Sequence, residues 1–444
     1  MNVHSAKFPI YRSLVILLAL ASGAAAQEAA PLQLTLRDAV NLALKQNPVV
    51  ILANLGVAQS QQERLVARSG LLPQASANAT EADQRFNIEA LLGRPFPGIP
   101  EHAGPFQTFQ AGASFEAPVF DLTLWRRYRS AQIGVDASRA GELTAREESV
   151  LLVVSQYLGS QRAAADVEAA QSQVDLAQAL YDQAADLQRH GVGTGIDTLR
   201  ANVQLQNNKQ RLIIARTALD TSLFGLARLL SVDPHRKIEL ADQVSFFDTP
   251  ATPVDQTIER AYAGRPELKQ IATEERQAGL ALQAAADARI PRVTVSGNWS
   301  QQGLTPDTVI PAYTYQASVS VPLFTGGRIQ AERAEADLAI KQLKQKEQDL
   351  RNRIALEVKT STARLESARG EVDVAKQGVD LARQEVEQAR DRFQAGVADN
   401  IEVITAQDEL ARANDNQIGA LYRYNQARAD LAHSAGQMEA LYAR

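Results

Sequence analysis

Proline is missing from two very long tracts of this 444-residue chain, and this absence constrains the fold more than any other feature of the sequence. No proline occurs between Val119 and Asp233, or from Leu323 to the C-terminus. Average usage near 5% would place about six prolines in each tract. Because proline breaks helices and the composition favours helix formers, both tracts are predicted to be mainly helical.

The remaining prolines mark an internal duplication. Four pairs of landmarks recur at nearly constant spacing, 218 residues for the first two pairs and 204 and 205 for the others: Pro48 with Pro266, Pro73 with Pro291, Pro118 with Pro322, and Gly191 with Gly396. A longer insertion between the two strand candidates of the first copy explains the difference. We expect a first repeat over residues 27–250 and a second over residues 251–444.

The second proline-free tract also carries a seven-residue apolar repeat. Its members are Val358, Leu365, Val372, Val379, Val386 and Phe393, and alanines follow three residues after several of them. The first tract has valines at two of the corresponding positions, Val167 and Val174. This pattern is typical of closely packed coiled-coil helices.

Each repeat is predicted to contain the same elements in the same order: a short helix, a helix of about 24 residues, two strands, a helix of about 70 residues, a glycine break and a return helix. Strands are expected at about 73–83, 107–118, 291–302 and 312–322, long helices at 119–190 and 323–394, and return helices at 196–230 and 400–435. Period-two alternation supports the strands, as at Val293, Val295 and Trp299. Strands of about ten residues have the length that tilted membrane strands require.

The N-terminus reads as a signal peptide over residues 1–26, because Lys7 and Arg12 precede a short apolar run and then small residues. That run is shorter than a membrane-spanning helix needs, so export is expected. Cysteine is absent, which excludes disulfides, thiolate chemistry and a lipid-bearing cysteine. The histidines have no metal-ligand spacing and no phosphate-binding loop occurs, so neither metal nor cofactor is expected. A net charge of -5 without a basic stripe disfavours a nucleic-acid partner.

Four membrane-type strands cannot close a barrel around a lumen, so their edges must pair with other copies of the chain. A trimer would supply twelve strands continuous with twelve helical columns. A dimer with eight strands would also close, and the residues alone leave the choice open.

Several segments together resemble the TolC family of outer membrane efflux proteins over nearly the whole mature chain: "NPVV" and "RPEL" at helix starts, "LLPQASANA" and "RIPRVTVSG" entering strands, "FEAPVFD" and "VSVPLFTGG" leaving them, and "DRFQAGVADNIEVITAQDEL". The resemblance implies a homotrimer with a 12-stranded outer membrane β-barrel continuous with a long periplasmic α-helical barrel. It also implies a Gram-negative outer membrane setting in contact with outer membrane lipid, and as partners a periplasmic adaptor protein and an inner membrane pump. Many relatives begin with a lipidated cysteine, which this chain lacks.

By the same resemblance, the second glycine break would form the periplasmic aperture. Glu402 matches an acidic ring position, Asp399 would contribute part of that ring, and Phe393 falls where relatives place an aromatic. An arginine of the family is replaced by Ala398, which puts an arginine latch in doubt. The two breaks would also dock the adaptor through Gly191, Val192, Gly193, Thr194, Gly396, Val397, Ala398 and Asp399. Helix termination is the competing interpretation for Gly191 and Gly396. For Asp399 it is helix capping, and for Glu402 a place in the first turn, where the helix dipole favours negative charge.

Passive efflux is therefore the leading functional hypothesis, with a type I protein secretion duct as the second. A periplasmic coiled-coil tether without a pore is a third, although aromatic alternating strands argue against it. An enzyme is not expected, because the carboxylates lie on helix faces without a catalytic arrangement.

Overall fold

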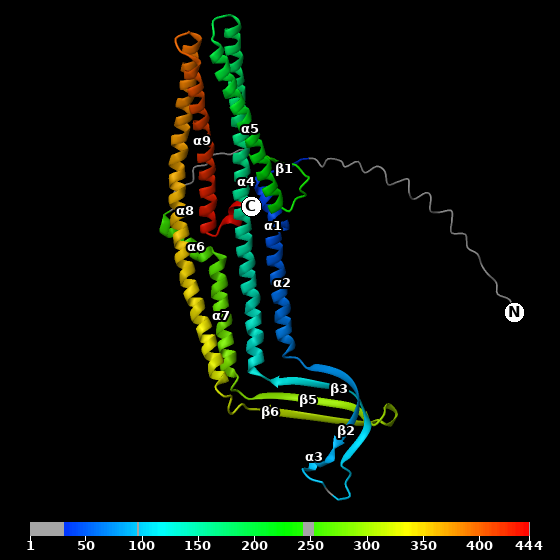
Figure 1. Ribbon diagram of the computed structural model, residues 1–444. Helices are drawn as coiled ribbons and strands as arrows, with labels where there is room; N and C mark the ends of the chain where they lie inside the picture. The colour runs from blue at the N-terminus through cyan, green and yellow to red at the C-terminus, as the bar shows by residue number, and fades with distance from the viewer. Residues whose placement is uncertain (1–30, 96, 243–252, 444) are drawn as a thin grey trace, which may run out of the picture.

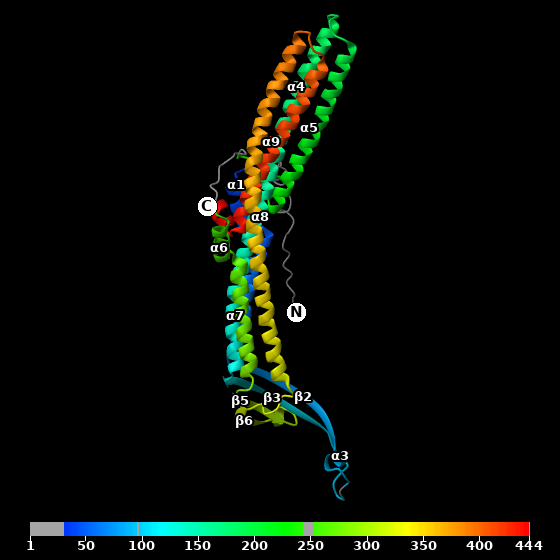
Figure 2. The same ribbon diagram turned by 90° about the vertical axis from the view of Figure 1, so that its left-hand side faces the viewer.

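The computed structural model describes residues 31–95, 97–242 and 253–443, and the predicted signal peptide lies outside them. The chain forms a long rod of helices that ends in a sheet, as both views show (Figures 1 and 2). None of the helices in the described ranges combines the length and hydropathy that crossing a membrane would require.

The first repeat consists of α1 (Leu36–Gln46), α2 (Pro48–Ser69), β2 (Gln74–Asn87), β3 (His102–Phe120), α4 (Leu122–Arg189) and α5 (Gly195–Leu229). A short helix, α3 (Ile88–Leu92), lies in the β2–β3 connection. Thr35 caps α1 through a reciprocal capping box with Asp38, and Asp121 caps α4 by accepting from the Leu124 amide at 3.0 Å. These caps satisfy amides that have no partner inside the helix.

The second repeat has the same order: α6 (Val254–Gly264), α7 (Pro266–Asp287), β5 (Arg292–Gly303), β6 (Ile310–Ser320), α8 (Arg328–Gln394) and α9 (Asn400–Ser434). A single 3-10 turn, η1 (Pro306–Thr308), joins β5 to β6. The described C-terminal part adds α10 (Met438–Tyr442).

Three details differ from the sequence-based expectation. The helix α8 begins at Arg328 instead of residue 323, because Gly326 and Gly327 adopt positive φ angles of 58° and 84° and hold the chain in a turn before it. The strands β2 and β3 extend beyond the expected ranges, to Asn87 and back to His102, so the first hairpin is longer than the second. The short parallel pair of β1 (Leu32–Leu34) and β4 (Ile238–Leu240) had no sequence signal.

The helices form columns above the sheet. In the half of the rod next to the sheet, α4 packs between α2 and α7, and α7 packs against α8. In the other half α4 packs against α5 and α9, and α9 against α8. The helix α5 stands above α2, and α9 above α7 (Figure 1). Strand order β2-β3-β5-β6 follows the helix order α2, α4, α7, α8, so β2 and β6 are the free edges.

In the part next to the helices, the sheet has one apolar and one polar face, which its register defines. Trp299 pairs with Tyr313 and with Ala113, and Val293 pairs with Val319 and Phe120, so the alternating apolar residues of all four strands share one side. The opposite side carries side chains that form hydrogen bonds: Gln74, Ser76, Asn78, Ser114, Ser296, Asn298, Thr314, Gln316 and Ser318. A sheet of this kind can separate lipid from water.

Midway along the rod, a group of contacts around Tyr157, here called the waist, fixes the helices to the short β1–β4 sheet. Tyr157 of α4 is fully buried, and its hydroxyl donates to the Leu34 carbonyl at 2.9 Å and to Asp242 at 3.1 Å. Burial raises the pKa of Tyr157, so this hydroxyl stays a donor. The Asp242 carboxylate also caps α1 by accepting from the Leu36 amide at 2.6 Å.

The joint between the short helix and the helix that follows it is held by different contacts in the two repeats. Asn47, which precedes Pro48, donates to the Leu229 carbonyl at the end of α5 at 2.9 Å. Arg265, which precedes Pro266, is 5% exposed and makes ion pairs with Glu267 at 2.7 Å and with Glu357 of α8. A neutral hydrogen bond therefore holds the first joint, and ion pairs around a buried arginine hold the second.

Candidate functional site

The two glycine breaks are helix-ending turns of the same type. Gly191 and Gly396 have φ angles of 76° and 73°, a conformation that glycine adopts without steric cost. At each turn the next amide reaches back to a carbonyl five residues earlier, from Val192 to Leu187 and from Val397 to Arg392, both at 3.0 Å. This is the Schellman pattern that satisfies the last carbonyls of a helix. Helix termination is thus sufficient to explain both glycines, and their docking role stays a prediction.

The residues after each glycine start the return helix. Thr194 caps α5, where its hydroxyl donates to Asp197 at 2.5 Å and accepts from the Asp197 amide at 3.4 Å. Asp399 caps α9 by accepting from the Ile401 amide at 3.1 Å. Asp399 therefore has the capping role that the sequence had left as a competing interpretation, and its carboxylate is exposed beside the α9 N-terminus.

Two of the expected docking residues, Val192 and Val397, are large apolar residues that are exposed. The Val192 and Val397 side chains are 77% and 67% exposed at the tips of the two turns. Gly193 is different, because a Cβ built on it would lie 2.9 Å from the Leu187 Cβ and 3.1 Å from the Gln188 amide nitrogen. A bulky residue at Gly193 would therefore disturb the turn itself, and the valines are the better probes of docking.

Glu402 forms an ion pair that the sequence analysis missed. Its carboxylate lies 2.8 Å from the guanidinium of Arg392, in the last turn of α8, and the Glu402 side chain is 43% exposed. An arginine is thus present at this turn even though position 398 holds alanine. No spacing rule predicts this contact, because the two residues lie on different helices that meet only after the turn is built.

Phe393 contributes to packing at the tip. It is half-buried against a cluster drawn from all four long helices, whose buried members are Leu180, Ala184, Ala201, Val386, Ala389, Val403 and Ala406. The small alanines in this cluster let the helices approach closely, as the seven-residue repeat indicated.

Two polar contacts tie the α8–α9 hairpin to the α4–α5 hairpin near the tip. The fully buried Asn400 donates to the Asp197 carbonyl at 2.9 Å, and Gln204 of α5 donates to Asp408 of α9 at 2.7 Å. The Oδ1 atom of Asn400 is buried without a partner among the described residues. Sequence reasoning missed these residues too, because an asparagine after a capping aspartate resembles an ordinary first-turn residue.

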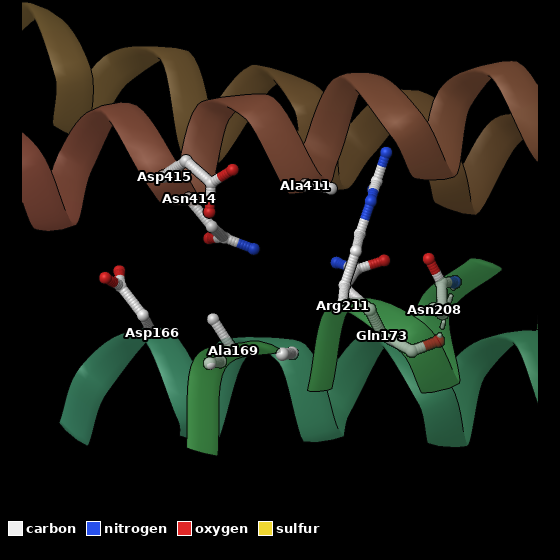
Figure 3. A pocket seen from close by; sticks show the side chains of 10 residues that line it. Asp166, Ala169, Gln173, Asn208, Arg211, Ala411, Asn414 and Asp415 are labelled. Atoms are coloured by element: carbon white, nitrogen blue, oxygen red, sulfur yellow. Dashed lines mark hydrogen bonds between the residues drawn. The ribbon is translucent and has the colours of Figure 1, made fainter. Parts of the chain in front are cut away.

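Farther from the tip the two hairpins separate around a cavity of about 190 Å³ lined by α4, α5 and α9. Asp166 and Asp415 extend into it from opposite sides, and Arg211 rises from α5 (Figure 3). Burial raises the pKa of both carboxyl groups, against the opposing charges of Arg162 near Asp166 and chiefly Arg211 near Asp415. No described group of acidic or histidine side chains could hold a metal ion.

These features define a class of protein. An apolar sheet face suits lipid, and a polar face suits a water-filled lumen. The columns attached to the sheet are far longer than a membrane is thick, because α4 and α8 have 68 and 67 residues. The arrangement is that of a membrane channel extended by a helical duct.

The family assignment follows from sequence comparison. The family model described as "Outer membrane efflux protein" matches residues 39–232 and 257–437. The chain therefore belongs to the outer membrane efflux protein family. It is an outer membrane exit channel that extends into the periplasm, and it has the TolC-like fold.

Individual relatives agree with this assignment. The alkaline protease secretion protein AprF of Pseudomonas aeruginosa is 24% identical over 417 residues, which cover 91% of this chain and 85% of AprF. The CmeC outer membrane channel of Campylobacter jejuni has a TM-score of 0.78 at 19% identity, over 90% of this chain and 85% of CmeC. The open MtrE channel of Neisseria gonorrhoeae has a TM-score of 0.73 at 17% identity, over 90% of this chain and 88% of MtrE.

Proposed function

We propose that this chain is the passive exit duct of a tripartite efflux system. Three copies would close one barrel in the outer membrane, and a periplasmic adaptor would dock on the turns and connect the duct to an inner membrane pump. The duplicated units at residues 27–250 and 251–444 would supply six near-equivalent turns around the periplasmic rim. The observation that carries the proposal is that the sheet and the helices leave the same two sides of the protomer unpaired.

Those two sides are complementary. One side presents the β2 edge with exposed apolar residues on α2 and α5, and the other presents the β6 edge with exposed apolar residues on α8. The exposed residues are Val49, Leu52, Leu55 and Val66 on α2, Leu199, Val203, Ile213 and Phe224 on α5, and Leu356, Val374 and Leu381 on α8. Within each helix, successive members are 3, 4, 7, 10, 11 or 18 residues apart. These spacings are sums of the three- and four-residue steps of a coiled-coil seam, so a ring of copies would bury the residues.

At the far end of the duct, a trimer would repeat each tip residue three times. Glu402 would form an acidic ring at the aperture, with Asp399 near it, and acidic rings favour cations. The ion pair with Arg392 supports a gating role, because it holds the Glu402 carboxylate in one orientation. The exposed Val192 and Val397 would give the adaptor apolar contacts on small, closely approachable turns.

Leu381→Asp tests the trimer. A buried, unpaired carboxylate at the seam should convert detergent-extracted trimers to monomers, whereas Leu381→Ala should retain most of the trimer. If Leu381→Asp runs as a wild-type trimer, the seam is wrong. Cross-linking of the wild-type trimer in cells, followed by identification of the adaptor and pump bound to it, tests the efflux assignment.

A type I secretion duct is the second candidate, and the similarity to AprF favours it. The two functions predict different outcomes when the chain is deleted. Loss of efflux would increase sensitivity to small toxic compounds. Loss of secretion would leave one exported protein inside the cell without that sensitivity.

A further inference from the structure

The inner wall of the sheet carries very little charge. In the ladder that joins Gln74–Gln84 to Phe106–Glu116 and continues through β5 and β6, the polar face has two charged positions, Glu116 and Arg292. Arg292 pairs with Ser320 at the end of the sheet nearest the helices. Its side chain belongs to the face of Thr294 and Ser296, which lines the water-filled side.

A second arginine, Arg127, lies in the second turn of α4, next to this end of the sheet. In α4, Leu124 lies beside Gly70, the residue that follows α2, while Arg126 donates to Asp287 of α7 at 2.9 Å. The directions from α4 to these two neighbours divide the circumference of the helix into a narrower and a wider sector. With about 100° of rotation per residue, Arg127 falls in the narrower sector and Arg129 in the wider one. In a wall of helices curved around a lumen, the narrower sector faces inward. Arg127 therefore points to the lumen and Arg129 to the outside.

Neither inward arginine has a counter-ion in the part of its own chain that the structure describes. Within the described ranges, neither Arg127 nor Arg292 makes an ion pair, and both are exposed. No carboxylate lies three or four residues from Arg127, where the sequence has Thr123, Leu124, Ser130 and Ala131. The helix α4 and strand β5 are interior elements of the protomer, so a neighbouring copy pairing with the free edges would not reach these side chains.

We propose that Arg127 and Arg292 form a basic ring at the junction of barrel and helical duct, which binds the carboxylate, sulfate or phosphate groups of anionic substrates in transit. The proposal rests on the trimeric duct proposed above, which would place six guanidinium groups around the lumen. Guanidinium is suited to these groups because its planar set of donors matches their paired oxygens.

The position of the ring gives it a function in an otherwise acidic channel. The chain has a net charge of -5, and an acidic aperture would disfavour anions. Glu116 pairs with Ser296, four residues from Arg292, so it lies about 13 Å farther into the barrel. Six guanidinium groups against three carboxylates leave the junction positive. An anionic substrate thus has one site of attraction where it leaves the helices and enters the barrel.

Polyanion block of single trimers in planar bilayers tests the ring. Inositol hexakisphosphate, added on the barrel side at low salt, should reduce the wild-type current. In the double variant Arg127→Gln, Arg292→Gln, the half-blocking concentration should rise at least tenfold. Arg129→Gln is the matched control, because Arg129 lies two residues away, is exposed and unpaired among the described residues, and faces outward; it should change block less than twofold. In 1 M salt, where the Debye length is about 3 Å, block should disappear.

The outcomes separate the ring from the duct. A conducting double variant that is blocked like the wild type overturns the ring and leaves the duct intact, as does an Arg129→Gln variant with an equal loss of block. A trimer that carries no current refutes the proposal that the protein is a duct. Calorimetric measurement of inositol hexakisphosphate binding to the detergent-solubilised protein then tests whether the basic ring exists. Binding that the double variant loses and Arg129→Gln keeps supports it; equal binding, or none in the wild type, overturns it.

Discussion

Replacing Arg265 by alanine should destabilise the second repeat more than any single change at the first repeat's joint. Arg265 is 5% exposed and is paired with Glu267 and Glu357, whose side chains are 23% and 38% exposed. Breaking a fully buried pair costs about 3–5 kcal/mol, and because water can reach the glutamates here we expect about 2–3 kcal/mol. The same change at Asn47 removes one hydrogen bond and one cap and should cost about 1–2 kcal/mol.

Circular dichroism of the detergent-extracted protein would measure this difference. We expect a transition roughly 5 °C lower for Arg265→Ala and roughly 2 °C lower for Asn47→Ala. Burial alone would raise the pKa of Glu267, but its hydrogen bond and ion pair with Arg265 hold that pKa below its ordinary value. A carboxyl whose pKa is lower in the folded state contributes stability above its unfolded pKa of about 4.3 and loses it as pH falls through the folded pKa.

The destabilisation by Arg265→Ala should therefore be full at pH 7 and shrink as the pH falls below about 4. Glu357→Gln, which keeps the shape of the side chain, should produce part of the same effect. A transition for Arg265→Ala within 1 °C of the wild type at pH 7, or a difference that does not change with pH, would refute the ion-pair explanation of this joint.

Three further predictions concern the tip and the cavity. Val192→Trp should leave the trimer at wild-type levels in the outer membrane but abolish complementation of a deletion strain; a missing trimer would contradict a docking role. Glu402→Gln should lower the cation-to-anion permeability ratio severalfold in planar bilayers, and an unchanged ratio would remove Glu402 from the aperture. Asp415→Asn should raise the unfolding temperature at pH 7, because burial raises the pKa of Asp415 and the folded state then disfavours its charged form. That gain should vanish at pH values below the ordinary carboxyl pKa, where both proteins are neutral at this position.

The helices and strands that have a strong local sequence pattern were the ones that could be predicted from the sequence. Proline exclusion and the seven-residue repeat anticipated helices that the structure places at Leu122–Arg189 and Arg328–Gln394, and alternation anticipated the strands. The parallel β1–β4 pair has three residues per strand and joins segments about 200 residues apart, so neither propensity nor periodicity could signal it.

The sequence predicted where the candidate site lies along the chain but not which contacts its residues make. The glycine turns could be located because glycine at a helix end has a physical reason that acts over a few residues. The contacts of Arg392 with Glu402 and of Asn400 with Asp197 depend on how four helices meet. Long-range packing of this kind leaves no pattern in a single sequence, and for the same reason the lumenal arginines emerged only from strand register and helix neighbours.

The waist around Tyr157 divides the long helix α4 into two arms. About 32 residues of α4 separate Tyr157 from Arg189, roughly 48 Å of helix at 1.5 Å per residue. A tilt of only 10° about the waist would move the tip by roughly 8 Å, comparable to the spacing between packed helices. If the hairpins tilt, the hydrogen bonds of Tyr157 with Leu34 and Asp242 would therefore limit the displacement of a tip that lies far from them.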